Sequence, residues 1–260
     1  MKKSHYLLLT LNALLFAGIA NAQNADTAKS SGWFQHNMHD IAGAAQIQAT
    51  YRYTYMGPLN RILAADGLPA LGANDIWLNL SMNHIHNNWI LEDGIGFTPW
   101  TTASANGVKT TFNQYQAFLK LGYNVIHKPG IRVFPFAGVD VSAAVLNIED
   151  NNHIKTTSDF SGELTNSSIS KTFYQPNFGI DIGGGFDYLI KMSDKTIDCL
   201  TIERSIPMGI RAGYYINAAR GDWRVDNNYR LQNGPDKNQS AFFVSVNIGL
   251  GYVVRKRSVN

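Results

Sequence analysis

The residues with the clearest chemistry are eight charged side chains that alternate with apolar neighbours. Four are basic and four acidic, so their formal charges cancel: Arg52, Lys120, Arg132 and Arg211 against Glu92, Asp140, Asp181 and Asp187. Charges withdrawn from water must be paired and hydrogen-bonded. The pattern predicts an internal ion-pair network, the alternative being pairs that exchange partners in a narrow gated pore.

Other residue types that support chemistry do not form a recognisable site. His84 and His86 share one face of an extended segment, and His36 and His39 have helical spacing, but neither pair has an evident third metal ligand. Nothing marks Cys199 as reactive. No Ser/His/acid or acid/His grouping gathers at one strand end, so we expect no catalytic, cofactor-binding or metal-ligating residues and no enzymatic activity.

Composition excludes several classes of protein. Charged residues make up only 16% of the 260 residues, aromatic residues 12%, and the formal net charge is +3. One cysteine cannot form a disulfide within the chain. The absence of a Lys/Arg run in the body of the chain argues against nucleic-acid binding, and the aromatic content argues against disorder.

The first 22 residues have the layout of a secretory signal peptide. Lys2 and Lys3 precede an apolar stretch from Tyr6 to Ile19, and a small-x-small site ends at Ala22. The apolar stretch is shorter than the roughly 20 residues of a membrane-spanning helix, which disfavours an uncleaved anchor. We expect cleavage after Ala22 and a periplasmic linker over residues 23–43.

Residues 44–255 predict an all-β domain, an eight-stranded antiparallel up-and-down barrel. Apolar and small polar residues alternate with period 2 in seven segments, most clearly from Phe242 to Val254. The segment from Trp89 to Pro99 is the weakest, because Asp93 falls on its apolar face. Counting along these strands puts Arg52, Lys120, Asp140, Asp181 and Arg211 near mid-height, and Arg132, Glu92 and Asp187 nearer the tight turns. Residues 256–260 form a short C-terminal tail.

The connections alternate between long loops and tight turns, so all long loops fall at one end of the barrel. The long connections are Gly57–Ala73, Thr101–Thr110, Ile148–Lys171 and Ala219–Gln239. Outer-membrane barrels have this arrangement, with long extracellular loops and short periplasmic turns. The first loop is unusually apolar. It would fold over the barrel mouth, extend as a hairpin toward a partner, or pack against neighbouring loops.

The two faces of the strands distinguish a membrane barrel from a secreted lipocalin-like barrel. The polar face carries Gly, Ser, Asn and Gln, which suit a narrow lumen better than a solvated surface. Aromatic residues flank the aliphatic band as two girdles, as expected at two membrane interfaces. We place Trp89, Tyr123, Tyr188 and Tyr252 at the turn end, and Tyr53, Tyr55, Tyr115, Tyr174, Tyr214 and Phe242 at the loop end.

With these features the chain resembles the small outer-membrane β-barrel proteins of the Bacteroidetes, similar in plan to the barrel of outer-membrane protein A and to outer-membrane protein X. The resemblance covers residues 44–255 and rests on Tyr51-Arg52-Tyr53, on Phe134 to Asp140 and on Phe178 to Gly185. It departs from the family pattern in lacking a terminal Phe on the last strand, which continues into Arg255-Lys256-Arg257.

The sequence thus predicts a Gram-negative outer-membrane protein with a structural or surface-interaction role. A narrow gated pore and a lipid- or peptide-modifying barrel enzyme are the alternatives. The expected partners are outer-membrane lipid, lipopolysaccharide and, during insertion, the barrel-assembly machinery; an extracellular ligand of the loops would be unidentified.

Overall fold

The computed structural model describes residues 40–126, 128–150, 170–197, 200–225, 229–232, 234–235 and 240–256. The predicted signal peptide, nearly all of the linker with His36 and His39, Cys199 and the last four residues lie outside the described part. No helix of the described residues is long and apolar enough to cross a membrane.

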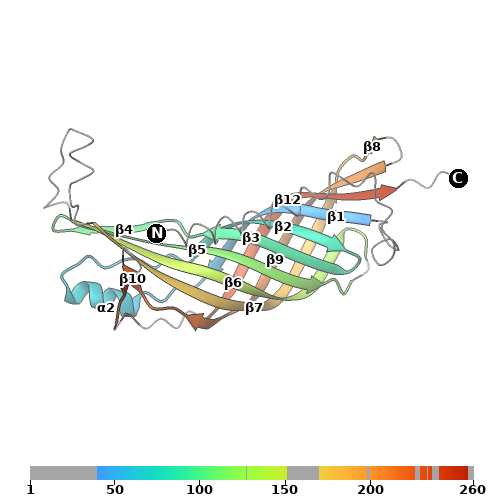
Figure 1. The fold of residues 1–260 in the computed structure, drawn as a ribbon. Coiled ribbons are helices and arrows are strands. Elements are labelled where there is room, and N and C mark those ends of the chain that lie inside the picture. The colour runs from blue at the N-terminus through green and yellow to red at the C-terminus, as the bar shows by residue number, and fades with distance from the viewer. Residues whose placement is uncertain are drawn as a thin grey trace, which may run out of the picture. The chain divides into compact units, whose positions relative to one another are not determined.

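Eight long antiparallel strands close into a barrel (Figure 1). Each pairs with the next along the chain, and the first pairs with the last over the full length of the first strand. The predicted eight-stranded barrel is confirmed. The strands are β1 (Asp40–Arg52), β2 (Ile76–His86), β3 (Trp89–Phe97), β5 (Val108–Tyr123), β6 (Ile131–Asp150), β7 (Lys171–Lys191), β9 (Leu200–Arg220) and β12 (Ala241–Lys256).

The barrel begins four residues earlier than the predicted boundary at residue 44. Asp40 pairs with Arg255 across the β1–β12 seam, and Ala42 also pairs with Ile85 of β2. Arg255 and Lys256 in turn pair with β9. Backbone hydrogen bonds therefore extend β1 and β12 beyond the residues whose apolar and polar side chains alternate clearly.

Three of the predicted loops contain regular structure. Gly57–Ala65 is a helix, α2. β4 (Thr101–Ala105) forms a hairpin with the start of β5, and its turn residues Asn106 and Gly107 both have positive φ, 52° and 77°. Asn-Gly is the sequence that such two-residue hairpin turns favour. Three short strands complete the sheet: β8 (Lys195–Ile197), β10 (Arg224–Val225) and β11 (Tyr229–Arg230).

The apolar face of the wall points outward and the polar face points inward. Ile95, Leu250 and Val246 are 60%, 67% and 57% exposed, whereas Gln48 and Asn83 are each 2% exposed. A soluble lipocalin-like barrel requires the opposite orientation, because its apolar face must leave water. The observed orientation therefore excludes that alternative.

Candidate functional site

A hydrogen-bonded ion-pair layer crosses the lumen around Arg211. The buried Arg211 guanidinium makes a bidentate contact with Asp187, at 2.7 and 3.2 Å, and its Nε lies 3.6 Å from the carboxylate of Glu92. Gln48 donates a hydrogen bond to the other Glu92 oxygen at 2.5 Å. Asn247 donates to Asp187 at 3.3 Å, and Ser81 accepts a hydrogen bond from Gln48 at 2.9 Å.

We call these six residues, Gln48, Ser81, Glu92, Asp187, Arg211 and Asn247, the Arg211 layer. They come from β1, β2, β3, β7, β9 and β12, so the layer connects most of the wall across the lumen. Counting along the strands predicts different heights for Arg211 and for its two carboxylate partners. The structure instead brings the three together, because antiparallel strands in a barrel are staggered and arginine is long enough to bridge the offset.

A second pair lies beside an aromatic cluster. Lys120 Nζ is 3.0 Å from Asp181 Oδ2, and both side chains are largely buried. The same ammonium lies 4.6 Å from the ring centroid of Phe118 and 5.2 Å from that of Phe243. Cations are attracted to the faces of aromatic rings, most strongly where water is excluded. The aromatic rings therefore supplement the single carboxylate that holds Lys120.

Arg52 is sandwiched between two aromatic rings. Its guanidinium carbon lies 4.1 Å from the ring centroid of Trp77 and 4.3 Å from that of Tyr215, and both aromatic side chains are buried. Asp140, which is 1% exposed, interacts electrostatically with Arg52. The sequence pattern did not predict these aromatic partners, because it described the inward face only by its small polar and charged residues, whereas Phe134, Phe136 and Phe243 are buried there too.

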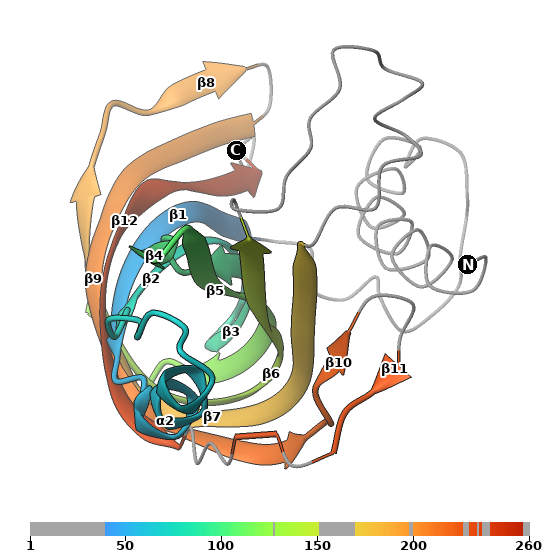
Figure 2. The ribbon, with the colours of Figure 1, turned by 90° about the vertical axis from the view of Figure 1, so that its left-hand side faces the viewer.

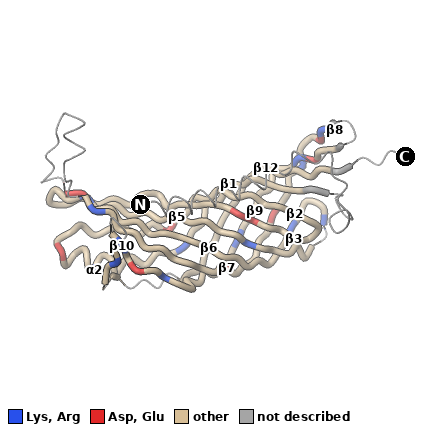
Figure 3. Tube along the Cα trace, in the orientation of Figure 1, with Lys and Arg blue, Asp and Glu red and all other residues tan. Residues whose placement is uncertain are grey.

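Arg132 takes a less enclosed position on the inward face. It is partly exposed and interacts electrostatically with Asp187 and Arg211. Of the eight predicted charged residues, five form the direct ion pairs described above: Glu92, Lys120, Asp181, Asp187 and Arg211. Figure 3 shows the charged positions scattered singly along a largely uncharged wall.

Helix α2 folds into the mouth of the barrel at the loop end (Figure 2). Leu59 and Leu63, one turn apart, are 3% and 2% exposed and pack in a cluster with Met56, Leu71, Phe112, Ala144, Leu146 and Trp223. Asn60 ties the returning chain to the helix, since its side chain donates to the carbonyl of Leu71 and accepts from its amide. Of the three alternatives for this loop, the structure shows two together: the helix folds over the mouth, and it packs against the neighbouring loops through Trp223.

The aromatic residues of the predicted girdles mostly point outward from the two ends of the apolar band. Trp89 and Tyr123 make an edge-to-face contact at the turn end, with centroids 5.1 Å apart, and Tyr214 and Phe242 make another at the loop end, at 4.8 Å. Tyr174 differs, because it is partly buried and its backbone pairs with Arg224 of β10. The others are exposed by 46–53%: Tyr53, Tyr55, Tyr115, Tyr188 and Tyr252.

The histidines of β2 do not assemble a metal site. His84 Nε2 lies 3.0 Å from Asp93 Oδ1 on the outward face. Within the described ranges, no group of three or more His, Cys, Asp or Glu side chains is placed to hold a metal ion. The contact with His84 gives Asp93, the residue that weakened the β3 pattern, a partner on the apolar surface.

The closed strand order, the exposed aliphatic band and the polar, ion-paired lumen define an integral membrane β-barrel of the outer-membrane type. An apolar surface that surrounds the whole wall is far larger than the few hundred square ångströms usual on soluble monomers. This assignment rests on the strand pairing and on the orientation of the side chains.

The chain matches no protein-family model and no curated protein. Among solved structures it is similar to Neisserial surface protein A, with 12% identity over 83% of this chain and 98% of that chain and a TM-score of 0.36. It is also similar to Ail, the attachment invasion locus protein of Yersinia pestis, with 10% identity, coverage of 82% and 98%, and a TM-score of 0.36. A major outer membrane protein from Thermus thermophilus shares 10% identity, with coverage of 81% and 98% and a TM-score of 0.36.

Proposed function

We propose that this protein is a closed, non-conducting outer-membrane barrel that stabilises the envelope and presents a rigid surface outside the cell. The observation that carries the proposal is that the lumen is filled at two levels. The Arg211 layer crosses it between six strands, and the apolar cluster around α2 fills the mouth. The side chains that occupy the lumen at these two levels oppose the continuous water-lined path that conduction requires.

The strand lengths support a surface role. A strand crosses a membrane with roughly 9–11 residues, whereas β6 has 20 and β7 has 21. At about 3.3 Å per residue and a tilt of about 40°, β6 rises about 50 Å, about twice the 25 Å apolar band of such barrels. The excess at the loop end carries Ala144 and Leu146, against which α2 packs. The capped mouth therefore stands outside the membrane as a folded platform.

The proposed partners follow from this placement. Outer-membrane phospholipid and lipopolysaccharide would contact the apolar band, and the barrel-assembly machinery would insert the chain. The Bacteroidetes kinship remains part of the proposal and is supported by the segments around Tyr51, Phe134 and Phe178. We propose no enzymatic activity, since six of the eight inward charged groups form ion pairs with each other or lie against aromatic rings, and the printed contacts do not arrange them around a nucleophile.

Single-channel recording in planar bilayers tests the closed lumen. The refolded full chain should give conductance indistinguishable from that of the bare bilayer. Stepwise conductance would instead establish the gated pore, and its loss on substitution of Arg211 would locate the gate. Heat-modifiability of outer-membrane fractions tests the membrane assignment: the unboiled barrel should migrate differently from the boiled chain, and a single band from freely soluble material would contradict it.

A further inference from the structure

A histidine–carboxylate pair lies on the lipid-facing surface of β2 and β3. His84 Nε2 is 3.0 Å from Asp93 Oδ1, and 58% of the histidine side chain and 26% of the aspartate side chain are exposed. The residues that pair with Asp93 on the two neighbouring strands are apolar, Met82 on β2 and Leu119 on β5. Each of these two is about half exposed. The pair therefore interrupts an aliphatic surface.

Asp93 lies at the middle of the apolar band. Its cross-strand partner Leu119 is four residues from Tyr115 of the loop-end girdle and four residues from Tyr123 of the turn-end girdle. Four residues rise about 10 Å, at about 3.3 Å per residue and a tilt of about 40°. An aspartate side chain is too short to reach an interface across that distance, unlike the lysine and arginine side chains that snorkel. A single barrel surrounded by lipid therefore exposes this carboxylate to hydrocarbon.

Ionisable groups in hydrocarbon are costly, and in membrane proteins they usually face other protein groups or a water-filled cavity. Most charges of this barrel follow that rule, since side chains such as Arg211 and Asp187 are buried in the lumen. Asp93 points outward instead. A protein surface packed against β2 and β3 would withdraw Asp93 and His84 from lipid.

The pair is complementary to itself under a two-fold rotation. Two barrels in one membrane have the same orientation, so the axis that relates them runs along the membrane normal and keeps every residue at its own height. Because the side chains of His84 and Asp93 touch within one chain, their ends lie at nearly the same height. Asp93 of one copy can therefore face His84 of the other, and the same contact occurs twice. A carboxylate accepts hydrogen bonds at both oxygens, and the contact within the chain uses Oδ1.

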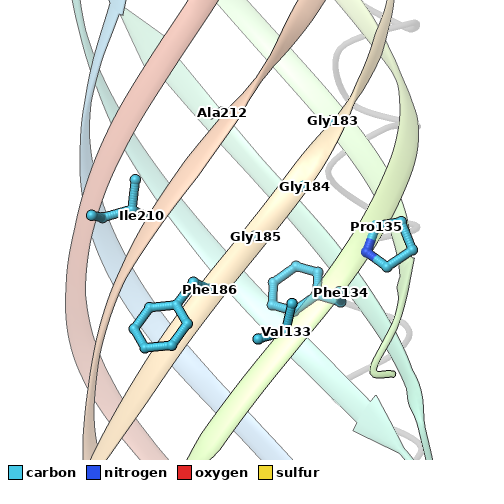
Figure 4. A pocket seen from close by; sticks show the side chains of 9 residues that line it. All are labelled: Val133, Phe134, Pro135, Gly183, Gly184, Gly185, Phe186, Ile210 and Ala212. Atoms are coloured by element: carbon cyan, nitrogen blue, oxygen red, sulfur yellow. The ribbon is translucent and has the colours of Figure 1, made fainter. Parts of the chain in front are cut away.

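The opposite face of the barrel supplies a comparison. β9 lies four strands from β3 in either direction round the closed sheet. Figure 4 shows the wall where β7 passes between β6 and β9, with Phe186 and Ile210 on one side of three consecutive glycines and Val133 on the other. Every residue that lines this shallow depression is apolar or glycine. That lining has no polar side chain to select a protein over lipid, so this face provides the control positions.

We propose that two copies of this chain form a two-fold dimer in the membrane through β2 and β3. Asp93 of each copy binds His84 of the other, and the two pairs lie between protein surfaces instead of in lipid. The aliphatic side chains around them, such as Met82 and Leu91, pack across the same interface. The inference rests on the membrane assignment of the proposed function, and it adds a specific partner to one part of the lipid-facing surface.

Energy transfer between labelled barrels measures the association. The full chain carries Cys199→Ser and Ser104→Cys, which places the dye on the β4 hairpin, beyond the apolar band. Donor- and acceptor-labelled barrels are refolded together in phosphatidylcholine vesicles over a range of protein-to-lipid ratios. Asp93→Leu and His84→Leu should each lower the dimer association constant about tenfold, as expected when polar contacts between membrane-spanning segments are lost. Ile210→Ala, on the opposite face, should leave the constant unchanged.

Mixing the two variants distinguishes contacts between copies from the contact within one chain. Neither Asp93→Leu nor His84→Leu contains the pair in its own chain, but a mixed dimer brings one Asp93 against one His84. Transfer from an Asp93→Leu donor to a His84→Leu acceptor should therefore exceed the transfer within either variant alone. If the mixture behaves as the separate variants do, the pair acts only within a chain and the proposal fails.

Disulfide cross-linking locates the interface. In the Cys199→Ser background, Met82→Cys lies beside the proposed axis and should give a cross-linked dimer when isolated outer membranes are oxidised. Ile210→Cys is similarly exposed on the opposite face and should remain monomeric. A Met82→Cys product that contains a different protein would assign this face to another partner and overturn the dimer.

Heat-modifiability of each variant in the vesicles separates failure of the dimer from failure of the membrane assignment. A chain that shows no boiling-dependent shift and stays outside the vesicles would overturn the membrane assignment. A heat-modifiable barrel whose energy transfer equals that of randomly distributed monomers at every ratio would overturn only the dimer. Unchanged association of the inserted Asp93→Leu barrel would overturn the role of the pair.

Discussion

Replacing Arg211 with methionine tests whether the ion-pair layer holds the barrel wall together. The side chain is 2% exposed and contacts Asp187 at 2.7 and 3.2 Å and Glu92 at 3.6 Å. Methionine preserves much of the contact with the Phe134 ring, whose centroid lies 4.7 Å from the guanidinium carbon, but removes the cation that directly contacts two buried carboxylates. Removing one partner of a buried pair costs about 3–5 kcal/mol. The expected change in the unfolding equilibrium is about 150- to 5,000-fold.

The assay is reversible unfolding of the refolded barrel in lipid vesicles by guanidinium, followed by tryptophan fluorescence and by the fraction that stays heat-modifiable. The control is Arg230→Met, because Arg230 also lies near a carboxylate, 3.9 Å from Asp222, but has 72% of its side chain exposed. This substitution should change the free energy of unfolding by no more than about 0.5 kcal/mol. Adding Asp187→Asn to Arg211→Met should recover part of the loss, since one uncompensated charge is then removed. If Arg211→Met is as stable as the wild type within about 1 kcal/mol, the layer is hydrated and carries little of the stability, contrary to the burial of both carboxylates.

Three further substitutions test other parts of the structure. Leu63→Ala should lower the free energy of unfolding by about 2–5 kcal/mol, because it opens a cavity under α2. Truncation of the exposed Ile62 to alanine should cost much less. Equal losses in denaturant melts would contradict the packing of α2 into the barrel mouth. Leu80→Arg should cost about 2–4 kcal/mol in vesicles, because Leu80 is 56% exposed on the lipid face, and an unchanged melt would contradict its membrane burial. Gly107→Ala should cost about 1–2 kcal/mol, since φ is 77° there, and a cost-free alanine would show that the β4–β5 turn relaxes.

The strand pairing was largely predictable because a barrel wall imposes period 2 on every strand. Ile47, Val246 and Leu250 alternate with Gln48, Asn247 and Gly249, so one group faces the lipid and the other the lumen. The Asn106-Gly107 dipeptide is also typical of a two-residue hairpin turn, but the sequence pattern predicted only a loop there. The extent of the first and last strands was less predictable, because their ends are set by backbone pairing rather than by side-chain polarity.

The cap and the charge partners depended on information that a single strand pattern does not contain. α2 spans nine residues, too few for a periodic signal, although Pro58 at its start and the Leu59/Leu63 spacing are typical of a short amphipathic helix. One partner of Arg211, Asp187, lies on the adjacent strand β7, but the other, Glu92, comes from β3, far away in the chain, and the barrel stagger decides which charges meet. Charge balance alone could predict a network but not its pairs.

The two fillings of the barrel differ in chemistry because they lie at different depths. Where the wall is surrounded by lipid, most of its aliphatic side chains face outward, so the lumen is filled by polar groups, by charges such as Arg211 and Asp187 that bridge strands, and by the aromatic rings that contact them. Beyond the membrane, β5, β6 and β7 continue as a curved sheet with water outside, so Phe112, Ala144 and Leu146 need an apolar cover. α2 supplies that cover with Leu59 and Leu63. The cap is therefore a small soluble-type core built on a membrane barrel, and substitutions there should alter the exposed platform while leaving the ion-paired wall intact.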